Sequence, residues 1–306
     1  MNTSDSPALP AGLVTRPLSR EDSRAVYELM AAVQLDDLGT VEIEEADIIS
    51  DWARPSHDVT ASSMAVLDGD TMVGYAELIA PERYDAAVLP SHQGRGIGTW
   101  LAAWIRDLAR SRGAQIVGMP VPEGSTGDRL LTALGYHVRW DSWVLALPEG
   151  ASIPDRPLPL GYSVGEARPD DYPAFHDVLE DAFLEWSRRE REPYDDFTAS
   201  VMGRPGFEPW QLRAVRDAAG AVVGAAITIM SDSNGMTGYV DRLAVRSDQR
   251  NRGLAQVLLV DAFARAREHG ADTCELSTDS RTGALGLYQK VGMVVTANWR
   301  HRAASL

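Results

Sequence analysis

The sequence contains one pattern twice, and this internal repeat constrains the fold more than any other feature. A glycine-rich segment at residues 93–98, QGRGIG, has a counterpart at residues 250–255, RNRGLA. Each segment follows a short apolar run typical of a strand and opens a helical pattern of apolar residues. A further glycine lies at the same separation downstream in both places, Gly135 after the first segment and Gly292 after the second. Repeated landmarks in the same order indicate two copies of one structural unit.

Two more landmarks lie upstream of the glycine-rich segments. Residues 18–22, LSRED, resemble residues 167–171, ARPDD, and Gly74 corresponds to Gly224. The separation of matching residues rises from 150 positions at these two glycines to 157 positions at the glycine-rich segments. The difference indicates an insertion of seven residues in the second copy, after Gly224.

Chain length and one linker-like segment place the expected domains. The 306 residues fit two domains of roughly 100–200 residues each. Residues 147–157, LPEGASIPDRP, are rich in proline and glycine, as linkers commonly are. We therefore predict an N-terminal domain at residues 1–150 and a C-terminal domain at residues 151–306.

Each copy is expected to be an α/β domain with a mixed sheet. The patterns predict a strand, two helical segments, two or three strands, the glycine-rich segment with its helix, a strand, a helix and a last strand. In the second copy we expect strands at residues 212–215, 221–228, 238–245 and 273–276.

A strand that enters a glycine-rich turn and then a helix forms a site for an anion. The first amides of the helix have no partner within it, and glycine lets a phosphate approach the backbone closely. A Rossmann loop has the pattern G-x-G-x-x-G after an early strand, and a Walker loop needs a lysine. Neither fits, because the glycine-rich segments come late in each copy and the single lysine of the chain is Lys290.

The pattern shared by the two segments, Q/R-x-x-G-x-G/A, resembles the acyl-CoA pyrophosphate loop of the GNAT superfamily of N-acetyltransferases. Each half of the chain is similar to one complete GNAT domain, and the tandem arrangement is similar to that of the mycothiol synthases. The resemblance implies a mixed sheet that splays between its fourth and fifth strands, with acetyl-CoA bound there as a co-substrate. It also implies that an acetyl group is transferred to the amine of a small molecule.

The resemblance further implies which residues bind acetyl-CoA in each copy. The strand before the loop would offer backbone hydrogen bonds to the pantetheine arm, and the loop would hold the pyrophosphate. In the C-terminal copy these residues are Leu243, Ala244 and Val245, then Arg250, Asn251, Arg252, Gly253, Leu254, Ala255 and Gln256. In the N-terminal copy they are Ala86, Ala87 and Val88, then Gln93, Gly94, Arg95, Gly96, Ile97, Gly98 and Thr99.

Only the C-terminal copy has the residues that the family uses for proton transfer. The family uses a tyrosine of the last helix as the acid for the leaving thiolate, and this position is Tyr288 here but Leu131 in the N-terminal copy. Asp241 is the candidate base, whereas Tyr84 stands at the matching position. One departure is Arg281, where the family often has an asparagine. The resemblance implies that the C-terminal copy catalyses and that the N-terminal copy at most binds acetyl-CoA.

The expected substrate is a small amine. Substrates of this fold enter over the first two helices of the domain, and Glu185, Trp186 and Asp195 lie in that stretch of the second copy. Carboxylates and aromatic rings attract cations, and the net charge of −15 suits a cationic partner. The same charge disfavours nucleic acid and anionic membranes as partners.

The remaining expectations concern metals, location and assembly. The six histidines show no metal-ligand spacing, so we expect no metal, and we expect Cys274 to be a buried structural residue. No apolar run is long enough to cross a bilayer, and the N-terminus lacks the pattern of a secretory signal, which predicts a cytoplasmic protein. Because both copies lie in one chain, we expect a monomer with an internal pseudo-dimer rather than a homodimer.

Two alternatives stay open beside a general small-molecule N-acetyltransferase. One is a mycothiol synthase or a close relative, which would carry out the same chemistry on one particular amine. The other is a non-catalytic, acetyl-CoA-binding regulatory protein, although the presence of Tyr288 argues against it.

Overall fold

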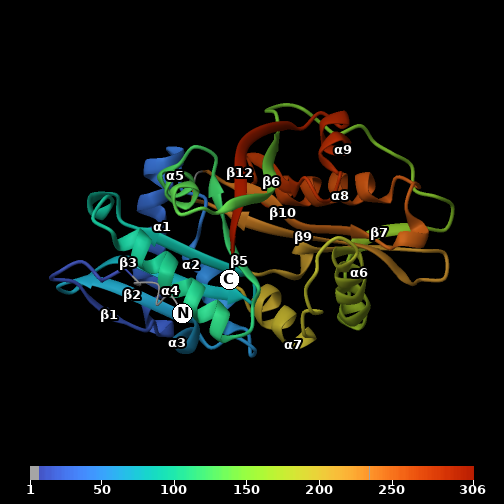
Figure 1. The fold of residues 1–306 in the computed structure, drawn as a ribbon. Helices are drawn as coiled ribbons and strands as arrows, with labels where there is room; N and C mark the ends of the chain where they lie inside the picture. The colour runs from blue at the N-terminus through green and yellow to red at the C-terminus, as the bar shows by residue number, and fades with distance from the viewer. Residues whose placement is uncertain (1–6, 234) are drawn as a thin grey trace. The chain divides into compact units, whose positions relative to one another are not determined.

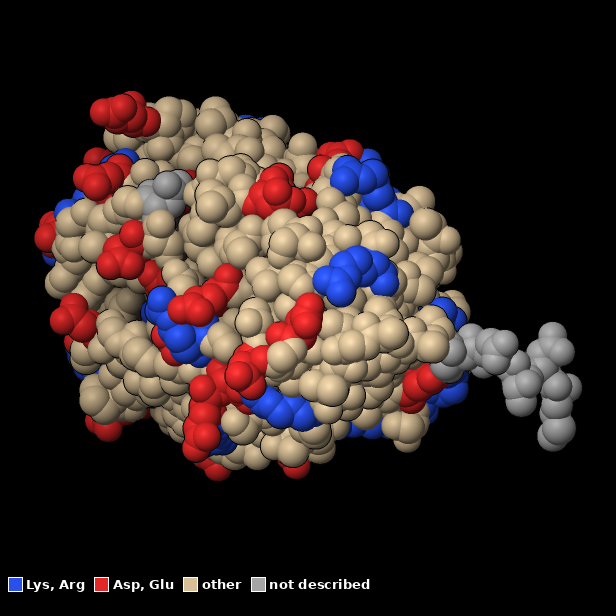
Figure 2. Space-filling view, turned by 90° about the vertical axis from the view of Figure 1, so that its left-hand side faces the viewer, with Lys and Arg blue, Asp and Glu red and all other residues tan. Residues whose placement is uncertain are grey.

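The computed structural model describes residues 7–233 and 235–306, and the chain divides into two compact units (Figure 1). The first unit comprises Met1–Asp141 and Asn298–Leu306, and the second comprises Ser142–Ala297. In the described parts of the chain, no helix is both long enough and apolar enough to cross a bilayer. Figure 2 shows acidic and basic side chains interspersed on one face, and that face carries no continuous basic patch.

The first unit is a mixed sheet with helices on both faces. Its strand order is β1-β2-β3-β4-β5-β12. Its strands are β1 Val14–Arg16, β2 Ser63–Asp68, β3 Thr71–Ala80, β4 Arg83–Val88, β5 Ile116–Pro122 and β12 Val294–Ser305. Its helices are α1 Ser23–Leu38, α2 Glu45–Ala53, α3 Val59–Ser62, α4 Ile97–Ser111 and α5 Thr126–Ala133. Because neighbouring strand residues point to opposite faces, Ala65 packs with Trp52 of α2 and Val66 packs with Ile97 of α4.

The second unit repeats this arrangement. Its strand order is β6-β11-β10-β9-β8-β7. Its strands are β6 His137–Leu147, β7 Ser163–Glu166, β8 Leu212–Arg216, β9 Val222–Ser231, β10 Thr237–Val245 and β11 Thr273–Asp279. Its helices are α6 Tyr172–Leu184, α7 Tyr194–Phe197, α8 Leu254–Glu268 and α9 Leu285–Lys290. Ala225 packs under Phe175 of α6 and the adjacent Ala226 packs under Leu258 of α8, so the two helices cover opposite faces.

The four strands expected in the second copy are confirmed as β8, β9, β10 and β11, with ends that differ by a few residues. The expected mixed α/β sheet is likewise present in both units. These strands were predictable because their apolar runs are bounded by turn residues.

The last strand of each sequence copy joins the sheet formed by the other copy. Residues Trp299–Ser305 of β12 pair antiparallel with Pro122–Ile116 of β5 in the first unit. Residues Ser142–Leu147 of β6 pair antiparallel with Asp279–Cys274 of β11 in the second unit. The compact units therefore divide inside β6 rather than at residue 150, and the chain returns to the first unit at its end.

In each unit the fourth and fifth strands pair in parallel over only part of their length. β4 and β5 share one register pair, Arg83 with Gly118. β10 and β11 pair from Thr237 with Thr273 to Val240 with Leu276, so residues 241–245 continue β10 beyond its pairing with β11. This is the splay that the family resemblance implies.

Candidate active site

The loops that precede α4 and α8 have the same backbone conformation. Gly94 and Gly96 have φ values of 73° and 92°, and the matching Asn251 and Gly253 have φ values of 63° and 79°. The left-handed conformation favours glycine, and asparagine is among the residues that tolerate it best. The sequence of the second loop therefore meets the same backbone requirement as that of the first.

Both loops leave backbone amides without a partner inside the helix. The first hydrogen bond within α8 runs from the Val257 amide to the Gly253 carbonyl at 3.1 Å, so the amides of residues 254–256 precede it. In α4 the corresponding bond runs from Trp100 to Gly96 at 3.0 Å. Among the described residues, no side chain caps either helix start. Such a helix start is suited to a phosphate group.

A segment that precedes β7 lies against the loop of the second unit. A Cβ atom at Gly253 would overlap Nε and Cδ of Arg156, so the Arg156 side chain lies over the loop. Gln256 Nε2 donates a hydrogen bond to the Pro154 carbonyl at 2.6 Å. Arg156 was missed by the sequence analysis, because a single arginine in a linker carries no pattern that places it on a distant loop.

The other members of the expected cofactor set lie on the same strand and loop. Leu243, Ala244 and Val245 form the end of β10, beyond its pairing with β11. Arg252 donates a hydrogen bond to the Tyr162 hydroxyl at 3.1 Å.

The first residue of each loop pattern ties the loop to the preceding strand. Arg250 Nε donates to the Val245 carbonyl at 3.1 Å, and Gln93 Nε2 donates to the Val88 carbonyl at 3.3 Å. Arg250 also forms two hydrogen bonds with Glu185, at 2.6 and 2.7 Å. These bonds lower the pKa of Glu185 and raise the pKa of Arg250. Glu185, expected at the substrate, here joins the end of α6 to the glycine-rich loop before α8.

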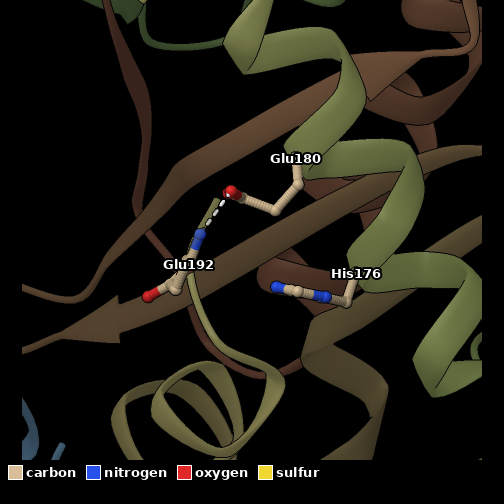
Figure 3. A group of neighbouring side chains, drawn as sticks. All are labelled: His176, Glu180 and Glu192. Atoms are coloured by element: carbon tan, nitrogen blue, oxygen red, sulfur yellow. Dashed lines mark hydrogen bonds between the residues drawn. The ribbon is translucent and has the colours of Figure 1, made fainter. Parts of the chain in front are cut away.

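A second charged cluster lies between α6 and β10. His176 Nε2 is buried without a hydrogen-bond partner, and ligand atoms of His176, Glu180 and Glu192 lie within 4.8 Å of one another (Figure 3). The spacing alone is compatible with a metal ion. Both carboxylates are already paired, however, because Glu180 accepts from Arg189 at 2.6 and 2.7 Å and Glu192 accepts from Arg242 at 2.7 Å. This internal charge balance leaves little excess negative charge to attract a divalent cation, and we assign no metal to the cluster.

Asp241 is the extra residue of a β-bulge. Val240 faces Thr228 of β9 and Arg242 faces the next residue, Ile227, so Asp241 has no counterpart on β9. A bulge redirects a side chain and is common beside active sites. Asp241 is exposed and forms a 3.5 Å ion pair with Arg242.

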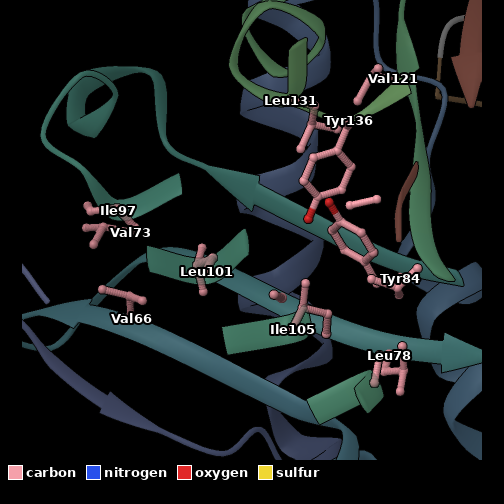
Figure 4. Close-up of a cluster of buried hydrophobic side chains, with 14 of the residues drawn as sticks. Val66, Val73, Leu78, Tyr84, Ile97, Leu101, Ile105, Val121, Leu131 and Tyr136 are labelled. Atoms are coloured by element: carbon pink, nitrogen blue, oxygen red, sulfur yellow. The ribbon is translucent and has the colours of Figure 1, made fainter. Parts of the chain in front are cut away.

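Tyr288 lies on α9 in the apolar cluster that also contains Val240 and Leu276. Only 9% of Tyr288 is exposed, and burial raises its pKa to about 12. The phenol therefore keeps its proton throughout the neutral range. Leu131 of α5 instead packs against Tyr136 in the core of the first unit (Figure 4). The two copies thus differ at this position in proton-donating capacity.

Trp186 and Asp195 lie in different surroundings. The Arg281 guanidinium stacks over the Trp186 ring at 4.7 Å and pairs with Asp279. Arg281, the departure from the family pattern, therefore covers a residue expected at the substrate. Asp195 lies exposed on α7.

The sequence matches the acetyltransferase (GNAT) family over residues 25–131 and 172–293. The chain belongs to this family. The two matched regions correspond to the two copies, and both contain one of the glycine-rich loops.

This GNAT protein is similar to several individual proteins over most of its length. It is 30% identical to a mycothiol acetyltransferase of Salinispora arenicola over 82% of this chain and 81% of that protein. A GCN5-related N-acetyltransferase from Sphaerobacter thermophilus superposes with a TM-score of 0.74, at 25% identity, over 97% of both chains. A tandem GNAT protein from the clavulanic acid biosynthesis pathway superposes with a TM-score of 0.72, at 20% identity, over 96% of this chain and 98% of that one.

Proposed function

We propose that the protein transfers an acetyl group from acetyl-CoA to the amine of a small molecule, and that the C-terminal copy carries out this reaction. The observation that carries the proposal is the start of α8. Its amides have no partner within the helix, and the loop before it adopts left-handed conformations at Asn251 and Gly253.

The loop and the end of β10 would hold acetyl-CoA. The amides of residues 253–256 suit the pyrophosphate, and Arg156 and Arg252 place two positive charges beside it. Residues 243–245 extend beyond the pairing with β11 and suit the pantetheine arm. Bound acetyl-CoA supplies the acetyl group as an activated thioester.

Two side chains would move the protons. Asp241 accepts the proton that the attacking amine loses, directly or through water. Tyr288 donates its proton to the departing thiolate, and its raised pKa keeps that proton available. The amine approaches over the stretch that contains Glu185, Trp186 and Asp195.

The N-terminal copy would at most bind acetyl-CoA. It has the loop conformation at Gly94 and Gly96, and residues 86–88 and 93–99 match the cofactor residues of the other copy. Leu131 in place of a tyrosine leaves it without the acid.

A second candidate is narrower. Relatives named mycothiol acetyltransferase match this chain at 27–30% identity and cover up to 91% of it, which favours testing the amine whose acetylation yields mycothiol. That amine belongs in the substrate panel beside amino sugars and aminoglycosides.

The test is an assay of free thiol released from acetyl-CoA across the amine panel. We expect Tyr288→Phe to lower kcat by about 10²–10⁴-fold, the usual contribution of a general acid, with little change in KM. Tyr84→Phe is the matched control, because Tyr84 is a buried tyrosine of the other copy, and it should leave turnover unchanged. Acetyl-CoA binding by calorimetry without thiol release from any amine would instead support the regulatory protein.

A further inference from the structure

The first unit contains a cavity that the proposed reaction does not use. Its volume is about 50 Å³, and it lies where α1 and α2 cover β3 and β4. At about 10–15 Å³ for each water-sized group, it has room for a few such groups. Four carboxylates, Asp47, Asp51, Glu77 and Asp85, line it together with apolar and aromatic side chains such as Met30, Trp52 and Tyr75.

Two of these carboxylates face each other across neighbouring strands. Glu77 of β3 and Asp85 of β4 are direct partners in the sheet register, an arrangement in which like charges are destabilising. Glu77 is fully engaged, because it accepts hydrogen bonds from Trp52 Nε1 at 2.8 Å and is bonded to His57 Nε2 at 2.6 Å.

Asp85 is less fully engaged, although the nearby positive charge of Arg83 partly offsets its own. Among the residues that the structure describes, none donates a hydrogen bond to its carboxyl group or forms an ion pair with it. Burial raises the pKa of Asp85. Asp85 is half-buried, and a carboxyl group that accepts no hydrogen bond in such a place is costly to ionise. A further cation in the cavity would lower that cost.

The matching position in the second unit carries the opposite charge. Val88 faces Gly74 in the first unit, and Val245 faces Gly224 in the second. Asp85 lies three residues before Val88, and Arg242 lies three residues before Val245. Arg242 supplies a cation that pairs with Glu192 at 2.7 Å. The second copy therefore contains its own cation at this point of the sheet, and the first copy has a cavity lined by carboxylates.

We propose that this cavity binds the ammonium group of a small organic amine, at a site separate from the acetyl-transfer site. The aromatic walls formed by Trp52 and Tyr75 suit the carbon atoms next to the ammonium group. Asp51, whose side chain is 52% exposed and forms a 3.6 Å ion pair with Arg54, marks the side open to solvent.

An organic cation fits better than an inorganic one. Divalent metal ions need several ligand atoms that converge closely. Among the residues that the structure describes, three such ligand atoms lie within 4.8 Å of one another at His176, Glu180 and Glu192. No three ligand atoms of the described residues that line this cavity come so close together. The apolar walls also offer no ligand to a metal ion.

The test is a titration of the whole chain, without acetyl-CoA, followed by NMR of labelled methyl groups. Met30, Ile43, Ile48 and Ile79 line the cavity and report on its contents. The probes are n-propylammonium chloride, the neutral 1-propanol and MgCl₂, each at the same ionic strength. We expect propylammonium to shift these methyl signals in a saturable manner and the other two probes to leave them nearly unchanged.

Two variants locate the interaction. Asp85→Asn removes the charge with little change of shape and should weaken propylammonium binding at least tenfold. Asp36→Asn, at an exposed position of α1, should bind as the wild type does. Equal shifts with 1-propanol, tighter binding of Mg²⁺, no saturable shift, or unchanged affinity in Asp85→Asn would each overturn the proposal. The comparison of probes on the wild-type chain is decisive even if Asp85→Asn does not fold. None of these readouts depends on acetyl transfer, so the proposal and the proposed function can fail separately.

Discussion

Replacing Gly253 with alanine tests whether the start of α8 holds the phosphates of acetyl-CoA. The new methyl group would have two consequences. It would place a non-glycine residue at a φ of 79°, and it would overlap the Arg156 side chain, which must move away. Both changes occur at the amides that we propose as phosphate ligands.

The two consequences have different magnitudes. A left-handed conformation costs a residue with a Cβ roughly 1–2 kcal/mol. For a domain of this size, this cost corresponds to a decrease in Tm of roughly 2–4 °C for each kcal/mol. Loss of one hydrogen bond to a charged phosphate is worth about 1.5–3 kcal/mol, which raises the KM for acetyl-CoA by roughly 10–100-fold.

The first unit provides a matched control. Gly96 has a φ of 92°, and the atom nearest to an added Cβ is Pro10 Cγ at 3.8 Å. Gly96→Ala should therefore lower Tm by a similar amount without displacing a side chain. If only the C-terminal copy catalyses, Gly96→Ala should leave the KM for acetyl-CoA unchanged.

Steady-state kinetics and thermal unfolding of the two variants decide the question. An unchanged KM in Gly253→Ala would refute the assignment of α8 as the phosphate site. An equal rise of KM in Gly96→Ala would show that the first copy takes part in turnover, contrary to the proposed division of labour.

Three further predictions follow from contacts within single units. Glu185→Gln breaks the exposed ion pair with Arg250, so the free energy of unfolding should change by less than about 1 kcal/mol. The KM for acetyl-CoA should change more than the KM for the amine. A larger change in the KM for the amine would favour direct contact between Glu185 and the amine. The methyl group of Gly118→Ala would overlap the backbone of Arg302, so the variant should lose about 1–3 kcal/mol of stability. Amide hydrogen exchange should become faster in residues 299–305, and unchanged slow exchange there would contradict the pairing of β12 with β5. Burial raises the pKa of Tyr288 to about 12, above its unfolded value near 10, so the folded state keeps this proton and loses stability as pH rises from 10 to 12. Urea titrations between pH 10 and pH 12 should show a smaller loss of stability for Tyr288→Phe than for the wild type.

The sequence predicted the parts of the structure that depend on neighbouring residues. The left-handed positions at Gly96 and Gly253 follow from glycine itself, and the strands around them follow from apolar runs bounded by turns. The resemblance to the family supplied the splay between the fourth and fifth strands. These features need no knowledge of which distant segments meet.

Contacts between distant segments were not predictable in the same way. Nothing in the linker sequence indicates that Arg156 lies over Gly253. The pairing of Glu185 with Arg250 could be predicted only by knowing how far α6 lies from the loop. The exchange of last strands was also missed, because the alternating pattern of a strand specifies a buried face but not the neighbouring strand.

The clearest difference between the copies lies at one strand position. Gly74 and Gly224 keep the same register with the fourth strand, so the backbone is shared and the side chain alone distinguishes Asp85 from Arg242. In the second unit the arginine pairs with Glu192, and the bulge at Asp241 immediately precedes it. In the first unit the carboxyl group faces Glu77 and lines a cavity. The two copies thus share the backbone conformation of the glycine-rich loop, while the charge at this position of the fourth strand is opposite. This difference is consistent with the proposed acetyl transfer in one copy and the proposed cation site in the other.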